Sequence, residues 1–142
     1  MPGILVGVDG SDNSRKALEW AVREAGLRGT SLTVLAVHQV ASNYWTGDPE
    51  TYAADAPETA IVRQAAEDAV QKAVSQAGEP APTSVTVRAV SGLAARELVA
   101  ASADADLVVV GSRGGGGFAR MRLGSVSSQV ASHADSPVVV IR

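Results

Sequence analysis

Glycines near the C-terminal end of the chain have the spacing of a site that holds phosphate groups. Gly111, Gly114 and Gly124 form the pattern G-x2-G-x9-G, and Ser125 follows directly. Because glycine carries no β-carbon, successive backbone N–H groups can approach phosphate oxygens closely. Gly124 and Ser125 also stand where a helix is expected to begin, and the free N–H groups there favour an anion. The pattern therefore predicts phosphate binding.

A carboxylate near the N-terminus supplies a second candidate group. Asp9 ends the apolar run 4–8, and a carboxylate at a strand end commonly holds Mg²⁺ or a hydroxyl group beside phosphates. A bridging Mg²⁺ would relieve the repulsion between this carboxylate and the phosphates. Capping of the helix that follows is the alternative role that the position of Asp9 allows.

The nine residues between Gly114 and Gly124 are rich in glycine and include Arg120 and Arg122. We expect a flexible, locally positive flap whose arginines are mostly solvated. Arg113 lies inside the glycine pattern and is the one arginine that we count as a candidate ligand.

Alternating apolar runs and helical patterns must position these groups. The expected strands are 4–8, 31–40, 85–90, 107–110 and 138–141, and the expected helices are 14–27, 58–77, 93–102 and 125–133. Such alternation predicts one doubly wound α/β domain over residues 1–142, with a parallel sheet covered by helices on both faces. Right-handed crossovers favour the Rossmann-like or flavodoxin-like strand order 3-2-1-4-5, in which Asp9 and Gly111 face one crevice.

Several boundaries remain open between alternatives. Ser11, Asp12 or Ser14 could cap the first helix, and Gly26 or Gly29 could end it. Ser91 or Gly92 could begin the third helix. Residues 41–57 lack either period and carry three aromatic side chains, so they are expected to form a long loop. This loop either packs over the sheet edge or serves as a lid or partner surface.

Composition excludes several classes of function. With 12 basic and 15 acidic residues the formal net charge is -3, which argues against nucleic acid or an anionic membrane as the main partner. The chain has no cysteine, and its two histidines have no metal-ligand spacing. It has no 18-residue apolar stretch and no basic segment before its first apolar run, so a cytoplasmic location is expected.

Recognised catalytic motifs are missing as well. The only lysines are Lys16 and Lys72, so there is no G-x4-G-K-[ST] loop, and no G-x-S-x-G pattern is present. Rapid phosphoryl transfer lacks its usual residues. We therefore expect a binding protein, not an enzyme.

These elements together resemble the ATP-binding branch of the universal stress protein family. The resemblance rests on Asp9-Gly10-Ser11, on the glycine pattern with Val126-Ser127 after it, and on the closing Pro137-Val-Val-Val-Ile. It covers essentially the whole chain. The chain departs from the family where Gly92-Leu93 lacks the proline often found there, and in the many glycines of its flap.

The resemblance implies a stress-response protein that binds ATP with Mg²⁺ and usually dimerises. It implies that Gly7 and Val8 line the base pocket, that the Val37 backbone meets adenine, and that Asp9 lies near ribose or the metal. The full set of candidate nucleotide-binding residues is Gly7, Val8, Asp9, Val37, Gly111, Arg113, Gly114, Gly124, Ser125, Val126 and Ser127.

Three hypotheses on function follow. The first is a regulatory protein whose bound adenine nucleotide (ATP, ADP or a cyclic nucleotide) changes a partner surface without rapid catalysis. The second is a slow Mg²⁺-dependent ATPase, with a water molecule placed by Ser125 or Ser127. The third is a dimerisation module alone. The apolar strand 138–141 lies at the expected sheet edge, where it is either covered by its own helices or open to another chain. The resemblance to a family that dimerises there implies a homodimer through this strand.

Overall fold

The computed structural model describes residues 3–39, 57–112 and 124–142. The strands are β1 (Gly3–Val8), β2 (Leu32–Gln39), β3 (Val85–Gly92), β4 (Ala105–Gly111) and β5 (Val138–Ile141). The helices are α1 (Asp12–Arg28), α2 (Pro57–Ala77), α3 (Ala94–Ser102) and α4 (Ser125–His133). The expected alternation of strands and helices is confirmed. None of the described helices combines the length and apolarity that a membrane crossing requires.

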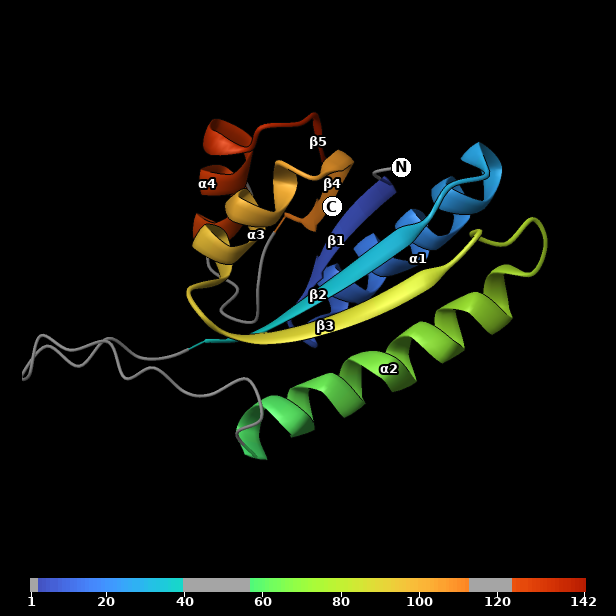
Figure 1. Cartoon of the computed structure of the whole chain (residues 1–142), viewed down its shortest axis with the longest axis horizontal. Coiled ribbons are helices and arrows are strands. Elements are labelled where there is room, and N and C mark those ends of the chain that lie inside the picture. Colours follow the sequence, from blue (N-terminus) through green and yellow to red (C-terminus); the bar gives the residue numbers. More distant parts are fainter. Residues whose placement is uncertain (1–2, 40–56, 113–123) are drawn as a thin grey trace, which may run out of the picture.

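All five strands form one parallel sheet in the order β3-β2-β1-β4-β5, as predicted. The central strand β1 pairs through Val6 with both Val34 of β2 and Val109 of β4. The chain first builds toward β3, then returns to the other side of β1 for β4 and β5 (Figure 1). This reversal places the switch point of the sheet between β1 and β4.

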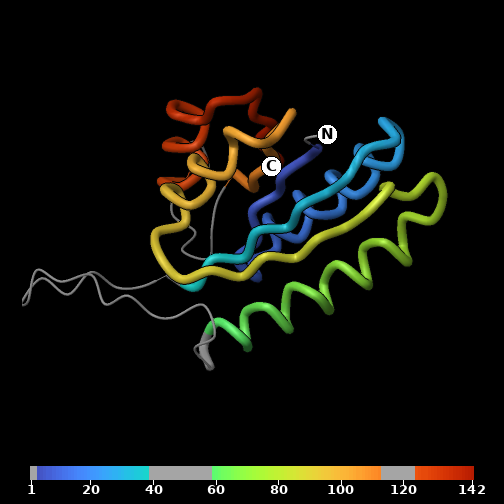
Figure 2. The backbone as a smooth tube through the Cα atoms, in the orientation of Figure 1, coloured from blue at the N-terminus to red at the C-terminus, as the bar shows by residue number. Residues whose placement is uncertain are grey.

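Side chains of β1 alternate between two cores. Ile4 and Val6 are buried in the core that α1 and α2 cover, whereas Leu5 is buried in the core that α3 and α4 cover. Figures 1 and 2 show these two pairs of helices on opposite faces of the sheet. Because successive side chains of a buried strand point to opposite faces of the sheet, β1 contributes to both cores.

The ends of α1 settle two of the open alternatives. Ser11 is the N-cap residue, because its side chain accepts a hydrogen bond from the backbone N–H of Ser14. Gly29 ends the helix in the left-handed conformation, at φ 64°, which glycine adopts without strain.

Two predicted boundaries were wrong. Pro57 is the first residue of α2, not the last of a loop, and proline suits this position because the first N–H of a helix has no partner within it. Ser91 and Gly92 belong to β3, where they pair with His38 and Gln39 of β2, and do not begin α3. Leu93 precedes α3 and makes no side-chain cap. The remainder of the expected 41–57 loop lies outside the described residues.

The outer edge of β3 is partly covered by a side chain of α2. Arg63 Nη1 donates a hydrogen bond to the backbone carbonyl of Val87 at 3.3 Å. The side chains of Thr86 and Arg88 on this strand are exposed. Polar and charged groups of this kind discourage pairing of an edge strand with another chain.

Candidate functional site

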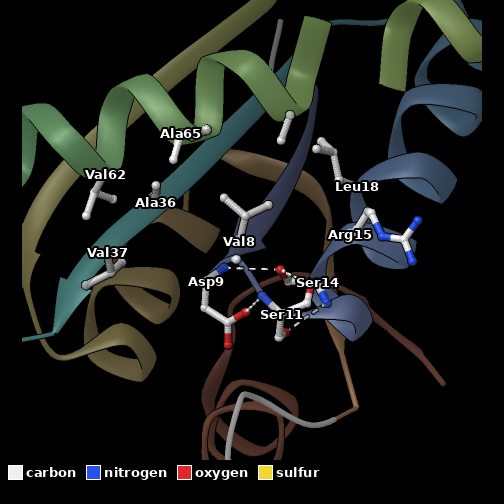
Figure 3. A pocket seen from close by; sticks show the side chains of 13 residues that line it. Val8, Asp9, Ser11, Ser14, Arg15, Leu18, Ala36, Val37, Val62 and Ala65 are labelled. Atoms are coloured by element: carbon white, nitrogen blue, oxygen red, sulfur yellow. Dashed lines mark hydrogen bonds between the residues drawn. The ribbon is translucent and has the colours of Figure 1, made fainter. Parts of the chain in front are cut away.

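A cavity of about 390 Å³ opens at the carboxyl ends of β1 and β2, between the sheet and helices α1 and α2 (Figure 3). Its polar lining comes from the turn between β1 and α1 and from the first turns of that helix. These residues are Asp9, Gly10, Ser11, Ser14 and Arg15. The rest of its lining is apolar, consisting of Val8, Leu18, Ala36, Val37, Val62, Ala65, Ala66 and Ala69.

Asp9 lies in a compact turn at the polar end of the cavity. One carboxylate oxygen accepts the backbone N–H of Ser11 at 2.9 Å, and the Asp9 N–H donates to the Ser14 hydroxyl at 3.2 Å. Because Ser11 caps α1, capping is not the role of Asp9. The residue is exposed, and Figure 3 shows its carboxylate directed away from Val8 and Ala36. The carboxylate is therefore accessible to a ligand.

Ser14 was not recognised from the sequence as part of this site. Its side chain is buried and also donates to the Ser11 carbonyl at 3.1 Å, so it supports the turn that presents Asp9. Only its position three residues after a strand-end turn hinted at such a role.

Small residues of α2 make the apolar part of the cavity possible. Ala65, Ala66 and Ala69 lie over the ends of β1 and β2, where larger side chains would fill the space. These alanines fall within the predicted helix 58–77, but nothing in the sequence marked them as lining a site. The spacing of the three alanines is consistent with one helical face, but it does not reveal what that face covers.

Gly111 brings the end of β4 against the first turn of α1. A β-carbon at this position would lie only 2.8 Å from the backbone carbon of Asn13, so no larger residue fits without movement. Gly111 is thus adjacent to the same first turn that supplies Ser11 and Ser14 to the cavity. The carboxyl ends of β1 and β4 meet there, as the strand order predicts.

The start of α4 is bound directly to the residue after β4. The backbone N–H of Gly124 donates to the carbonyl of Ser112 at 2.6 Å, and the Ser127 hydroxyl lies 3.0 Å from the same carbonyl oxygen. Ser112, which no sequence pattern marks as a site residue, is 8% exposed. These contacts bring the two ends of the glycine pattern together.

The predicted site residues fall into four groups. Val8, Asp9 and Val37 line the cavity, whereas Gly111, Gly124, Ser125, Val126 and Ser127 lie at the ends of β4 and α4. Gly7 faces the opposite core, since a β-carbon there would lie 2.9 Å from the methyl groups of Leu98. Arg113 and Gly114 lie outside the described residues.

For a metal ion, the described part of the chain offers few ligands. It contains no group of three or more histidine, cysteine, aspartate or glutamate side chains that could hold one. Mg²⁺ is often bound by one or two carboxylates together with the phosphates of a substrate. Asp9 could take part in such a site only together with oxygen atoms that a ligand supplies.

Comparison with known proteins identifies relatives along the whole chain. The family model of the universal stress protein family matches residues 2–142. A universal stress protein of Mycolicibacterium smegmatis is 36% identical over 139 residues, covering 98% of this chain and 47% of the relative. One of Mycobacterium tuberculosis is 40% identical over 141 residues, covering 98% of this chain and 44% of the relative. The chain thus spans about half the length of these curated relatives.

Solved structures of similar proteins share the fold. The universal stress protein UspA from Lactobacillus plantarum has a TM-score of 0.72 and 27% identity, covering 99% of this chain and 97% of its own. A universal stress protein in complex with cAMP has a TM-score of 0.67 and 26% identity, with 99% and 96% covered. One from Archaeoglobus fulgidus in complex with dAMP has a TM-score of 0.60 and 26% identity, with 100% and 98% covered. The chain belongs to the universal stress protein family.

Proposed function

We propose that this chain binds an adenine nucleotide, with ATP as the first candidate, and that the bound nucleotide regulates contact with a partner. The observation that carries the proposal is the cavity at the ends of β1 and β2, which is polar at the Asp9 turn and apolar between α2 and the sheet. A nucleoside has the same division between a hydroxylated sugar and a flat base. The volume of about 390 Å³ lies within the usual range for small-molecule sites.

In this proposal the base occupies the apolar part of the cavity. Val8 and Val37 lie on the sheet side, and Ala66 lies opposite them on α2. Two neighbouring universal stress proteins were solved with cAMP and with dAMP, ligands that share adenine but differ in sugar and phosphate. Recognition of the adenine base is the common element that we transfer to this chain.

The phosphates extend from the Asp9 turn toward the start of α4. The backbone N–H groups of Ser125 and Val126 belong to the first turn of that helix and have no carbonyl partner within it. Together with the positive end of the helix dipole, they suit an anion. Asp9 would hold Mg²⁺, directly or through water, or a ribose hydroxyl. The glycine pattern calls for phosphate but does not fix the number of phosphates, and ATP is the first candidate because of the resemblance to the ATP-binding branch of the family.

Binding without rapid turnover fits the residues better than catalysis does. The described site contains no lysine, and the Ser127 hydroxyl is engaged with backbone carbonyls. A slow ATPase remains the alternative because Asp9 could hold Mg²⁺ beside the phosphates. Release of inorganic phosphate that accompanies the purified protein and disappears in Asp9→Ala would favour that alternative.

Calorimetry with Mg-ATP tests the proposal. We expect wild-type protein to bind and Asp9→Ala to bind at least tenfold more weakly, a loss of about 1.4 kcal/mol. Asp104→Ala is the matched control, because Asp104 is exposed, stands before β4 at the opposite end of the sheet and does not line the cavity. Failure of the wild type to bind ATP, ADP, AMP or adenosine would refute the proposal. Nucleotide that copurifies with the protein, identified by mass spectrometry, would support it.

We also propose that β5 pairs with a second copy of the chain. All four residues of β5 are apolar and partly exposed, and β5 is an edge strand. The carbonyls of Pro137 and Ile141 accept hydrogen bonds from Val108 and Ser112 on the β4 side. Since backbone groups alternate along a strand, those of Val138 and Val140 face outward, available to a partner strand.

Sedimentation velocity with Val140→Pro tests this pairing. Proline removes an outward N–H group without removing a bond to β4, so the protein should stay folded but sediment as a monomer. The Val140 side chain packs against the core that α3 and α4 cover, so circular dichroism must first show that the variant is folded. A wild type that remains monomeric at all concentrations would contradict the pairing.

The cytoplasmic location remains a prediction from the sequence that cell fractionation would check.

A further inference from the structure

The side chain of Ser127 has a different role from the one that its place after the glycine pattern suggests. It is 2% exposed, and its hydroxyl oxygen lies 3.0 Å from the carbonyl oxygen of Ser112 and 3.0 Å from that of Gly124. Carbonyl oxygens only accept hydrogen bonds, so the hydroxyl group donates its single proton to them. The hydroxyl therefore serves the backbone and is not directed at a ligand.

The Ser112 carbonyl consequently holds the start of α4 through two donors, the Gly124 N–H at 2.6 Å and the Ser127 hydroxyl. Ser112 is itself fixed, because its N–H donates to the Ile141 carbonyl at the end of β5 at 2.7 Å. One residue thus connects the first turn of α4 to the ends of β4 and β5.

The first turn of α4 needs this support because its N-cap residue is a glycine. Gly124 has no side chain that could accept a hydrogen bond from the turn, as Ser11 does at the start of α1. The Ser128 N–H makes the first bond back to the Gly124 carbonyl, at 2.9 Å. The three preceding amides, at residues 125–127, have no carbonyl partner within the helix. Their direction depends on how the turn is held against β4.

We propose that Ser127 is a positioning residue, which aims the amides at the start of α4 toward the phosphates without contacting the ligand. This inference rests on the proposed nucleotide function and specifies how its phosphate end is built. The glycine at the N-cap leaves room for an anion, and the serine three residues later supplies the restraint that the glycine cannot. The effect of Ser127 should therefore be confined to the phosphate-dependent part of the affinity.

Calorimetric titration of the full chain with Mg-ATP and, separately, with adenosine tests this role. We expect Ser127→Ala to bind ATP at least fivefold more weakly than wild type while its affinity for adenosine is unchanged. Ser127→Thr should restore ATP binding, because a threonine hydroxyl in a helix can bond to a carbonyl three or four residues earlier. Ser128→Ala, at the exposed neighbouring position, should behave as wild type.

Amide hydrogen exchange provides a readout in the absence of ligand. In Ser127→Ala the Gly124 and Ser128 amides should exchange faster, whereas the amides of β1 should keep their rates. Circular dichroism checks that each variant is folded before its affinity is compared.

Three results would overturn the inference. Unchanged ATP affinity in Ser127→Ala would show that the hydroxyl is dispensable. An equal loss for ATP and adenosine would show a general effect on the domain. If the wild type binds neither ATP nor adenosine, the proposed nucleotide function is wrong. Faster amide exchange in Ser127→Ala would then show only that Ser127 stabilises the start of α4.

Discussion

The two faces of the sheet are packed in different ways, although the same strands supply both. On the face that α3 and α4 cover, Gly7 leaves so little space that a β-carbon would lie 2.9 Å from the methyl groups of Leu98. On the face that α1 and α2 cover, the next residue of β1, Val8, borders a cavity of about 390 Å³. Successive residues of one strand thus meet a closed core and an open site.

This difference arises from the helices. α3 directs Leu98, which is 3% exposed, against the centre of the sheet, whereas α2 directs Ala66 and Ala69 against the strand ends. A large side chain fills its face, and small side chains leave theirs hollow. We infer that the α3 and α4 face supplies stability to the end of β1, while the α1 and α2 face supplies the binding volume.

Leu98→Ala should have the largest effect on stability. Removal of a buried leucine side chain from the closed face should lower the free energy of unfolding by about 2–5 kcal/mol. Urea denaturation measures this loss. Calorimetry on the folded variant should give wild-type nucleotide affinity, and a strong loss of binding would show that the two faces are not independent.

Gly7→Ala should be destabilising to a smaller degree. The added methyl group would force Leu98 to move within a filled core, at a cost of about 1–3 kcal/mol. The combination Gly7→Ala with Leu98→Ala should be less destabilising than the sum of the two changes, because the second change vacates the space that the first requires. Additive losses in a double-mutant cycle would contradict the contact.

Ala66→Leu should affect binding and spare the fold. A leucine at this position projects into the cavity, so adenosine and ATP should both bind about tenfold more weakly, a loss of about 1.4 kcal/mol. The free energy of unfolding should stay the same or rise, because apolar surface fills an existing space. Ala60→Leu, on the exposed side of α2, is the matched control. Unchanged affinity in Ala66→Leu would place the base elsewhere.

Arg63→Ala should have the smallest effect. The bond from Arg63 to the Val87 carbonyl is exposed and 3.3 Å long, so its loss should cost about 0.5 kcal/mol of unfolding free energy. A much larger loss in urea denaturation would mean that this contact is a main attachment of α2 to the sheet. The packing of α2 on the sheet would then depend on the contact at the edge strand β3 as well as on the buried core.

Much of the fold could be predicted from the sequence because it depends on periodicity. The apolar runs and the alternation of elements were sufficient for the strand order, and with it the meeting of β1 and β4. The alternatives at Ser11 and Gly29 could not be settled that way, since several neighbouring residues can cap a helix equally well. Gly92 was expected to begin the third helix but lies in β3, because glycine occurs both at the ends of strands and at the starts of helices.

The site was less predictable, for physical reasons that particular residues illustrate. Ser112 contributes through its backbone carbonyl, which every residue type has, so no sequence pattern distinguishes it. The alanines of α2 could be recognised as helical, but their place over the ends of β1 and β2 depends on how the helix packs. Ser127 could be associated with the glycine pattern, yet the direction of its hydroxyl follows only from the carbonyls around it.

The cover that Arg63 provides for β3 has a consequence for the size of any assembly. A sheet with two open edges can add copies without limit, whereas a sheet with one covered edge can extend only from the other. Since β3 carries this cover and β5 is apolar and partly exposed, two copies joined at β5 would present a covered strand at each outer end. Further growth would have to use the β3 edges, where Arg63 and the exposed side chains of Thr86 and Arg88 oppose pairing, so the proposed assembly would favour a closed pair.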